Sequence, residues 1–200
     1  MKTKISQRAI ILSIVLILLL GCLSGCGASK SPGEFRGIPF GTKFNEAKDL
    51  MAADLKEQGY NADPEEFYAR RDSYYSLSYS GVNLYDYKTT VNLLFYDETK
   101  NGDKDNSIFY FGNYYISFED LEECETCYKF FYDKLKEKYG NGKPYEEYKE
   151  SITANCEGTQ FINNGTDIKL YQQLIYYNGA PINVCCVKIE YTSTKIQQQC

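Results

Sequence analysis

The chain has 200 residues, a formal net charge of −5 at pH 7, 20 tyrosines, 8 cysteines, and neither histidine nor tryptophan. The absence of histidine excludes a Ser-His-Asp triad, a Cys-His pair and histidine-ligated metals. The acidic balance gives no electrostatic basis for binding nucleic acid, so we expect no nucleic-acid partner. No Gly-rich phosphate-binding loop is present, and we expect no cofactor.

The amino-terminal segment has the three zones of a secretory signal. Three basic residues come first, residues 9–20 are apolar apart from one serine, and residues 21–26 are small and weakly polar. An apolar core of this length is shorter than the roughly 20 residues of a membrane-spanning helix. We therefore predict that residues 1–25 are a cleaved signal peptide.

The signal ends in Leu23-Ser24-Gly25-Cys26, which resembles the bacterial lipobox. Cys22 is a second candidate, but the bulky Leu20 stands where a small residue is usual, and an ordinary cleaved signal is the remaining alternative. A lipidated Cys26 would carry at least two acyl chains, such as palmitate, which anchor a protein stably. We expect a lipoprotein on the extracytoplasmic face of the cell membrane, with residues 26–34 as the lipidated cysteine and its tether.

Residues 35–200 have the length of one domain. Loss of the three basic residues of the signal changes the formal net charge from −5 to −8. The lipid, rather than attraction to anionic headgroups, must therefore hold the domain at the membrane. Tyrosine suits half-buried strands, and this structural interpretation is preferred to a purely binding role.

The first half of the domain predicts one helix and three strands. Apolar residues at helical spacing indicate a helix over residues 43–58, with Thr42 as its N-cap and Gly59 as its C-terminal stop. Residues 60–72 are polar and receive no assignment. Alternating or aromatic runs then predict strands near 75–79, 91–96 and 108–116.

The second half repeats this order. An apolar stripe predicts a helix over residues 121–139, opened by a capping box of Ser117 and Asp120 and closed by Gly140. Strands are expected over residues 159–163, 166–177 and 182–192. Asn-Gly pairs at 164–165 and 178–179 predict hairpin turns between them.

This order predicts an α+β domain made of tandem helix-plus-three-strand units, covering about 35–117 and 118–192. Successive strands joined by hairpins form an antiparallel sheet, and helices packed on one face leave the other face open. Three short motifs accompany the pattern: Gly37-Ile-Pro-Phe-Gly-Thr42, Glu46-Ala-Lys48 and Lys138-Tyr-Gly140. Together they resemble a group of uncharacterised lipoproteins of Clostridia-type bacteria.

The repeat of a helix and a strand meander is similar to the β-lactamase inhibitory protein fold and to the small outer-membrane-assembly lipoproteins. This resemblance implies protein–protein binding rather than catalysis. It transfers no binding residue to this chain.

Six cysteines follow Cys26 and are disulfide candidates in an exported domain, with up to three bridges and no connectivity fixed. Cys185 shares the core-facing parity of Val187 and is expected to pair with Cys124 or Cys127. Those two residues form a C-x-x-C, for which thiol–disulfide exchange is the alternative, although neighbouring glutamates disfavour a reactive thiolate. The six candidates are Cys124, Cys127, Cys156, Cys185, Cys186 and Cys200.

The acidic loop at residues 97–106 superficially matches a calcium-binding loop. Thr99 and Ile108 occupy its third and twelfth positions, where such a loop needs oxygen ligands from Asp and Glu. We therefore predict a solvated hairpin loop and no metal site.

These observations favour a lipid-anchored binding or envelope-assembly domain that meets a protein or cell-wall partner. Strand parity places Tyr96, Tyr171 and Gln173 on the open face as candidate contacts. The alternative is a surface hydrolase or thiol-redox enzyme that works without histidine.

Overall fold

A computed structural model describes residues 33–61, 63–69, 74–97, 99, 102–149, 154–177 and 180–196. Two α-helices lie in this part of the chain, α2 (Phe44–Glu57) and α3 (Leu121–Tyr139). The strands and the short 3-10 helix, in chain order, are β1 (Glu34–Phe35), β2 (Ile38–Pro39), β3 (Glu65–Ala69), β4 (Tyr74–Leu84), β5 (Tyr87–Tyr96), η1 (Lys104–Asn106), β6 (Ile108–Phe118), β7 (Lys143–Lys149), β8 (Ala154–Asn163), β9 (Thr166–Tyr177) and β10 (Ala180–Ser193).

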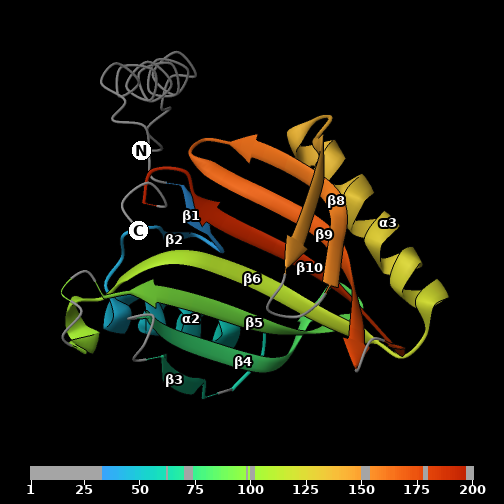
Figure 1. Cartoon of the computed structure of the whole chain (residues 1–200). Helices are drawn as coiled ribbons and strands as arrows, with labels where there is room; N and C mark the ends of the chain where they lie inside the picture. Colours follow the sequence, from blue (N-terminus) through green and yellow to red (C-terminus); the bar gives the residue numbers. More distant parts are fainter. Residues whose placement is uncertain are drawn as a thin grey trace, which may run out of the picture. The chain divides into compact units, whose positions relative to one another are not determined.

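Eight strands form one sheet in the order β3-β4-β5-β6-β10-β9-β8-β7 (Figure 1). All its pairings are antiparallel, and β6 and β10, the last strands to follow each helix, meet at its centre. The domain is therefore of the α+β class with an antiparallel sheet, as predicted.

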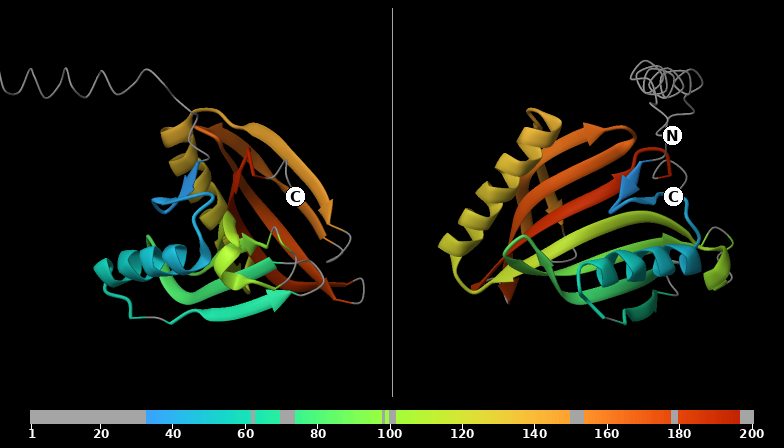
Figure 2. Two further views of the ribbon diagram at one scale, coloured as in Figure 1. Left: turned by 90° about the vertical axis from the view of Figure 1, so that its left-hand side faces the viewer. Right: turned by 180° about the vertical axis from the view of Figure 1, so that it is seen from behind.

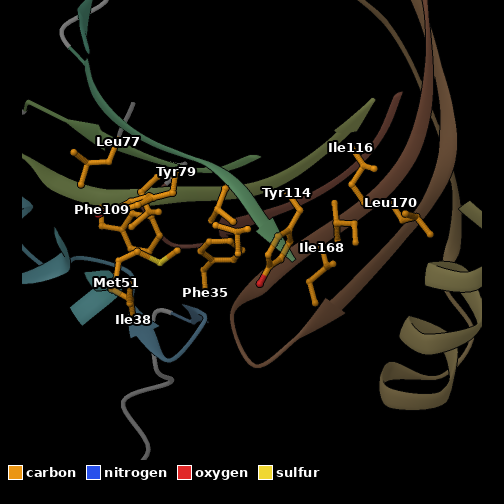
Figure 3. Close-up of a cluster of buried hydrophobic side chains, with 14 of the residues drawn as sticks. Phe35, Ile38, Met51, Leu77, Tyr79, Phe109, Tyr114, Ile116, Ile168 and Leu170 are labelled. Carbon is orange, nitrogen blue, oxygen red and sulfur yellow. The ribbon is translucent and has the colours of Figure 1, made fainter. Parts of the chain in front are cut away.

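Both helices lie on the same side of the sheet. Figure 2, seen from behind, has α2 and α3 in front of the strands, whereas Figure 1 looks onto the other face. Buried residues of both helices belong to one apolar cluster with inward-facing residues of the strands. Figure 3 follows this cluster from Leu77 and Phe109 on one side to Ile168 and Leu170 on the other.

The GIPFGT motif belongs to a small hairpin, β1–β2, which closes the core between the helices. Phe35, Ile38 and Phe40 are buried there, and the ring of Phe35 lies against Gly112 of β6. A Cβ atom at Gly112 would lie 2.4 Å from Cδ1 of Phe35. The strand therefore needs glycine at this position to admit the phenylalanine ring.

The ends of the helices differ from the predicted caps. Asp120, and not Ser117, is the N-cap of α3, and its carboxylate accepts a hydrogen bond from the backbone N–H of Glu123. The N-cap of α2 is Lys43, which makes no side-chain cap, while the hydroxyl of Thr42 donates to the carbonyl of Pro39. Gly59 has a φ of +84° directly after α2 and ends it as predicted.

The predicted count of three strands after each helix is wrong, because four follow each helix. The additional strands, β3 and β7, are the two edges of the sheet. Their sequences, EEFYA and KPYEEYK, are charged. Charged edge strands resist pairing with other chains, and for this reason they look like loops in a hydropathy pattern.

The Asn164–Gly165 turn between β8 and β9 is confirmed, with positive φ at both residues. The second predicted turn, at residues 178–179, and the predicted lipidation site Cys26 lie outside the described residues.

Candidate binding face

The helix-free face of the first half of the sheet carries an aromatic patch. Register pairing aligns Phe67, Ser76, Leu94 and Phe111 across four strands. The flanking residues Leu93 and Phe95 point into the core, so Leu94 must point the other way. We define the aromatic patch as Phe67, Tyr74, Leu94, Tyr96 and Phe111.

The patch is accessible to a partner. Phe67 is 60% exposed, and the other four residues are half-buried. Tyr96, a candidate contact from the sequence, is at the end of β5 and pairs with Tyr74 on β4. The structure thus places Tyr96 among half-buried neighbours of the aromatic patch, on a surface that neither helix covers.

Tyr171 and Gln173 lie on the same face of the second half, but they are not accessible. Tyr171 is 0% exposed and Gln173 is 4% exposed. Gly158 pairs with Tyr171 from the neighbouring strand, and the ring of Tyr145 on β7 reaches over this glycine to within 5.9 Å of the Tyr171 ring. Strand parity gave the correct face for both residues, yet both are buried, and Tyr145 of the edge strand β7 covers Tyr171.

A polar cluster is buried beneath this cover. The Tyr171 hydroxyl donates to the carboxylate of Glu190, and the Cys186 thiol lies 3.8 Å from Oε1 of Gln173. Lys188 lies over the rings of Tyr115 and Tyr171. Because these groups satisfy one another, they hold β9 and β10 in register rather than presenting reactive atoms to a substrate.

One disulfide joins Cys124 of α3 to Cys185 of β10. It is one of the two pairings expected for Cys185, and Cys124 is therefore not bonded to its C-x-x-C neighbour. Cys127 is buried and lies outside this bridge, and burial raises the pKa of its thiol to about 12. Cys186 faces away from Cys185, as its strand position predicts, whereas the side chain of Cys156 and all of Cys200 lie outside the described part.

Two carboxylates of the β5–β6 loop accept hydrogen bonds from the loop's own backbone. Asp97 is buried and accepts hydrogen bonds from the backbone N–H groups of Thr99 and Gly102. Asp103 caps η1 by accepting from the backbone N–H of Asp105. Across the described ranges, no group of three or more Asp, Glu or Cys side chains could hold a metal ion.

An open pocket of about 780 Å³ lies where the β4–β5 hairpin approaches the start of α3. Tyr87 and Phe118 contribute apolar surface, and the carboxylates at its walls are Asp86, Asp120, Glu122 and Glu123. One of these, Asp120, already serves as the helix cap. The sequence indicated Asp120 as part of a helix start and predicted no site at Asp86, Tyr87 or Phe118.

The comparisons add no relative to this description. No family model matches the chain, no curated protein sequence matches it, and no solved structure matches its fold. The resemblance to repeat-containing lipoproteins therefore stays a prediction. Within residues 33–196, in the part that the structure describes, no helix is long and apolar enough to cross a membrane.

Of the aromatic patch, the sequence indicated only Tyr96 as a contact and missed the other four members, of which Phe111 and Phe67 are the most instructive. Phe111 lies in an almost wholly aromatic run, where a bulge between β5 and β6 changes which residues share a face. Phe67 lies in a segment that received no assignment. Its position between two glutamates and a tyrosine carried a short strand signal, but the strand is too short to stand out alone.

Proposed function

We propose that the chain is a lipid-anchored binding domain, held by Cys26 on the extracytoplasmic face of the membrane, which binds a protein partner through the aromatic patch. The observation that carries the proposal is the row of accessible aromatic side chains on the helix-free face. Aromatic residues are enriched and charged residues are depleted at the centres of protein interfaces. No member of the patch is charged.

The position of the patch also supports a docking role. The first-half face continues to the edge strand β3, where Phe67 is 60% exposed. Covering such an exposed apolar side chain with a partner removes apolar surface from water and therefore favours binding. By contrast, on the second-half face the ring of Tyr145 covers Tyr171, the candidate contact there, which is 0% exposed.

We further infer that the domain is a tandem repeat, with a unit of one helix and four strands. In the sheet order, β3 to β6 and β7 to β10 run from the two edges to the centre. Each helix precedes its own four strands in the chain. This arrangement supports duplication of one unit, which the resemblance to repeat-containing inhibitory proteins also implies.

The thiol-redox alternative gains no support. A catalytic C-x-x-C needs an accessible thiolate of low pKa. Cys124 is bonded to Cys185, and the pKa of Cys127 is raised to about 12 by burial.

The anchor is tested by labelling cells with an alkyne analogue of palmitate. We expect label on the wild-type chain and on a Cys22→Ser variant, and loss of label on a Cys26→Ser variant. Equal labelling of the wild type and Cys26→Ser would refute the lipid assignment, independently of the binding proposal.

The docking face is tested by a photo-crosslinking amino acid introduced at position 67 or 96 in cells. Position 129 on α3 serves as the control, because Lys129 is exposed and lies on the helix side. We expect one crosslinked protein species from positions 67 and 96, weakened by a Phe111→Ser substitution within the same patch, and none from position 129. Crosslinks of equal yield from all three positions would contradict a specific face, and crosslinks to purified cell wall alone would assign the partner to the wall.

A further inference from the structure

Four tyrosines line a pocket on the helix side of the sheet, opposite the aromatic patch. The pocket has a volume of about 130 Å³ and lies between α3 and the central strands β6 and β10. Its tyrosines are Tyr85, Tyr114, Tyr139 and Tyr191. They come from the β4–β5 turn, β6, the end of α3 and β10, so only the folded chain brings them together.

The hydroxyl groups of this pocket are incompletely paired. Tyr114 is 7% exposed, and its oxygen accepts a hydrogen bond from Arg36 at 3.3 Å. Among the described residues its own O–H has no acceptor, and the hydroxyls of Tyr85, Tyr139 and Tyr191 make no hydrogen bond. Tyr85 is 60% exposed, and Tyr139 and Tyr191 are half-buried, so these hydroxyls can reach solvent or a ligand. A buried hydroxyl such as that of Tyr114, by contrast, normally finds a partner. The pocket therefore offers several O–H donors that an acceptor could satisfy.

Figure 3 shows the orientation of the most buried member. Tyr114 lies between Phe35 and Ile168, with its oxygen directed away from the sheet. Its ring forms an edge contact with the ring of Tyr191, with centroids 6.2 Å apart. The two phenols consequently belong to the same wall of the pocket.

The charges around the pocket favour an anion. Lys134 and Lys138 line it, and no carboxylate does. Nζ of Lys134 lies 3.9 Å from Oε2 of Glu137, a weak ion pair. The guanidinium of Arg36, by contrast, forms a close ion pair with Oδ2 of Asp54 at 2.5 Å. The pocket thus combines two ammonium groups with phenol donors, although the mature domain is strongly acidic.

The remaining lining is apolar and sets the size of the ligand. Leu84, Phe131, Leu135 and Ile189 complete the walls. A cavity of about 150 Å³ holds one benzene ring. We propose that this pocket binds a small monocarboxylate with a compact apolar body, whose carboxylate accepts from the tyrosine hydroxyls and whose body contacts the leucines and Phe131.

The proposal is tested with benzoate as the probe and benzamide as its uncharged analogue. Binding to the full chain in non-ionic detergent is measured by isothermal titration calorimetry. We expect saturable one-site binding of benzoate and at least about tenfold weaker binding of benzamide, since hydrogen bonds to a charged group are the stronger ones. A Tyr191→Phe variant removes one donor and should weaken benzoate about tenfold.

Tyr115→Phe is the matched control, because Tyr115 lies over Lys188 on the helix-free face and should leave benzoate binding unchanged. Lys138→Gln changes an exposed helix residue without disturbing the core and should also weaken benzoate. Equal affinity for benzoate and benzamide would overturn the proposal. So would the same affinity in the Tyr191→Phe, Lys138→Gln and Tyr115→Phe variants, or a failure of benzoate to saturate the wild-type chain. None of these outcomes depends on the aromatic patch.

Discussion

Removal of the Cys124–Cys185 disulfide should lower the free energy of unfolding by about 4 kcal/mol. The two cysteines are 61 residues apart in the chain, and the bridge restricts the unfolded state by closing this loop. The loop-entropy relation gives about 4 kcal/mol for a loop of this length. For a domain of this size, that difference corresponds to a fall of about 10 °C in Tm.

The perturbation is a Cys124→Ala/Cys185→Ala double variant, measured by urea unfolding followed through tyrosine fluorescence. The double substitution avoids leaving one unpaired thiol in the core, where both side chains are buried. The wild type with reductant should approach the stability of the variant, and the variant should not respond to reductant. A Cys127→Ala variant is the control, because Cys127 is outside the bridge and its response to reductant should match that of the wild type.

Two results would refute this reasoning. The first is a wild-type chain whose unfolding midpoint is the same with and without reductant. The second is mass spectrometry after alkylation under unfolding, non-reducing conditions that finds both Cys124 and Cys185 labelled.

Three further changes test the core, the sheet and a helix end. Tyr79→Phe should raise stability by about 1 kcal/mol, because the Tyr79 hydroxyl is buried without a hydrogen-bond partner in the described structure, whereas Tyr171→Phe should lower it by removing the bond to Glu190. Burial raises the pKa of Tyr79 from 10.0 to about 12, so between pH 10 and 12 the unfolded state releases this proton before the folded state and the free energy of unfolding falls as pH rises. Urea unfolding at pH 9 and 11 should show a smaller decline for Tyr79→Phe than for the wild type. Gly158→Ala should prevent normal pairing of β8 and β9, since its Cβ would lie 2.0 Å from a backbone carbonyl oxygen, and unchanged amide exchange in these strands would contradict this. Asp120→Ala should lower stability by about 1 kcal/mol through loss of the α3 cap, and an unchanged Tm would show that the cap is dispensable.

The sequence alone determined the features that depend on local order. The apolar stripe of α3, the positive-φ glycine after α2 and the Asn164–Gly165 turn follow from backbone preferences within a few residues, and all three are present. The α+β class followed because hairpin turns between successive strands favour an antiparallel sheet, on one face of which helices can pack. Parity also placed Tyr96 and Tyr171 on the correct face of the sheet.

Only the tertiary structure determined the features that depend on contacts between segments far apart in the chain. The edge strands β3 and β7 form because each pairs with a neighbouring strand, and their charged sequences alone do not predict a strand. Whether Tyr171 is exposed depends on Tyr145 reaching across Gly158, a contact between three strands. The choice of Cys124 over Cys127 for Cys185, and the four tyrosines of the helix-side pocket, likewise require distances between residues far apart in the chain, which no local pattern contains.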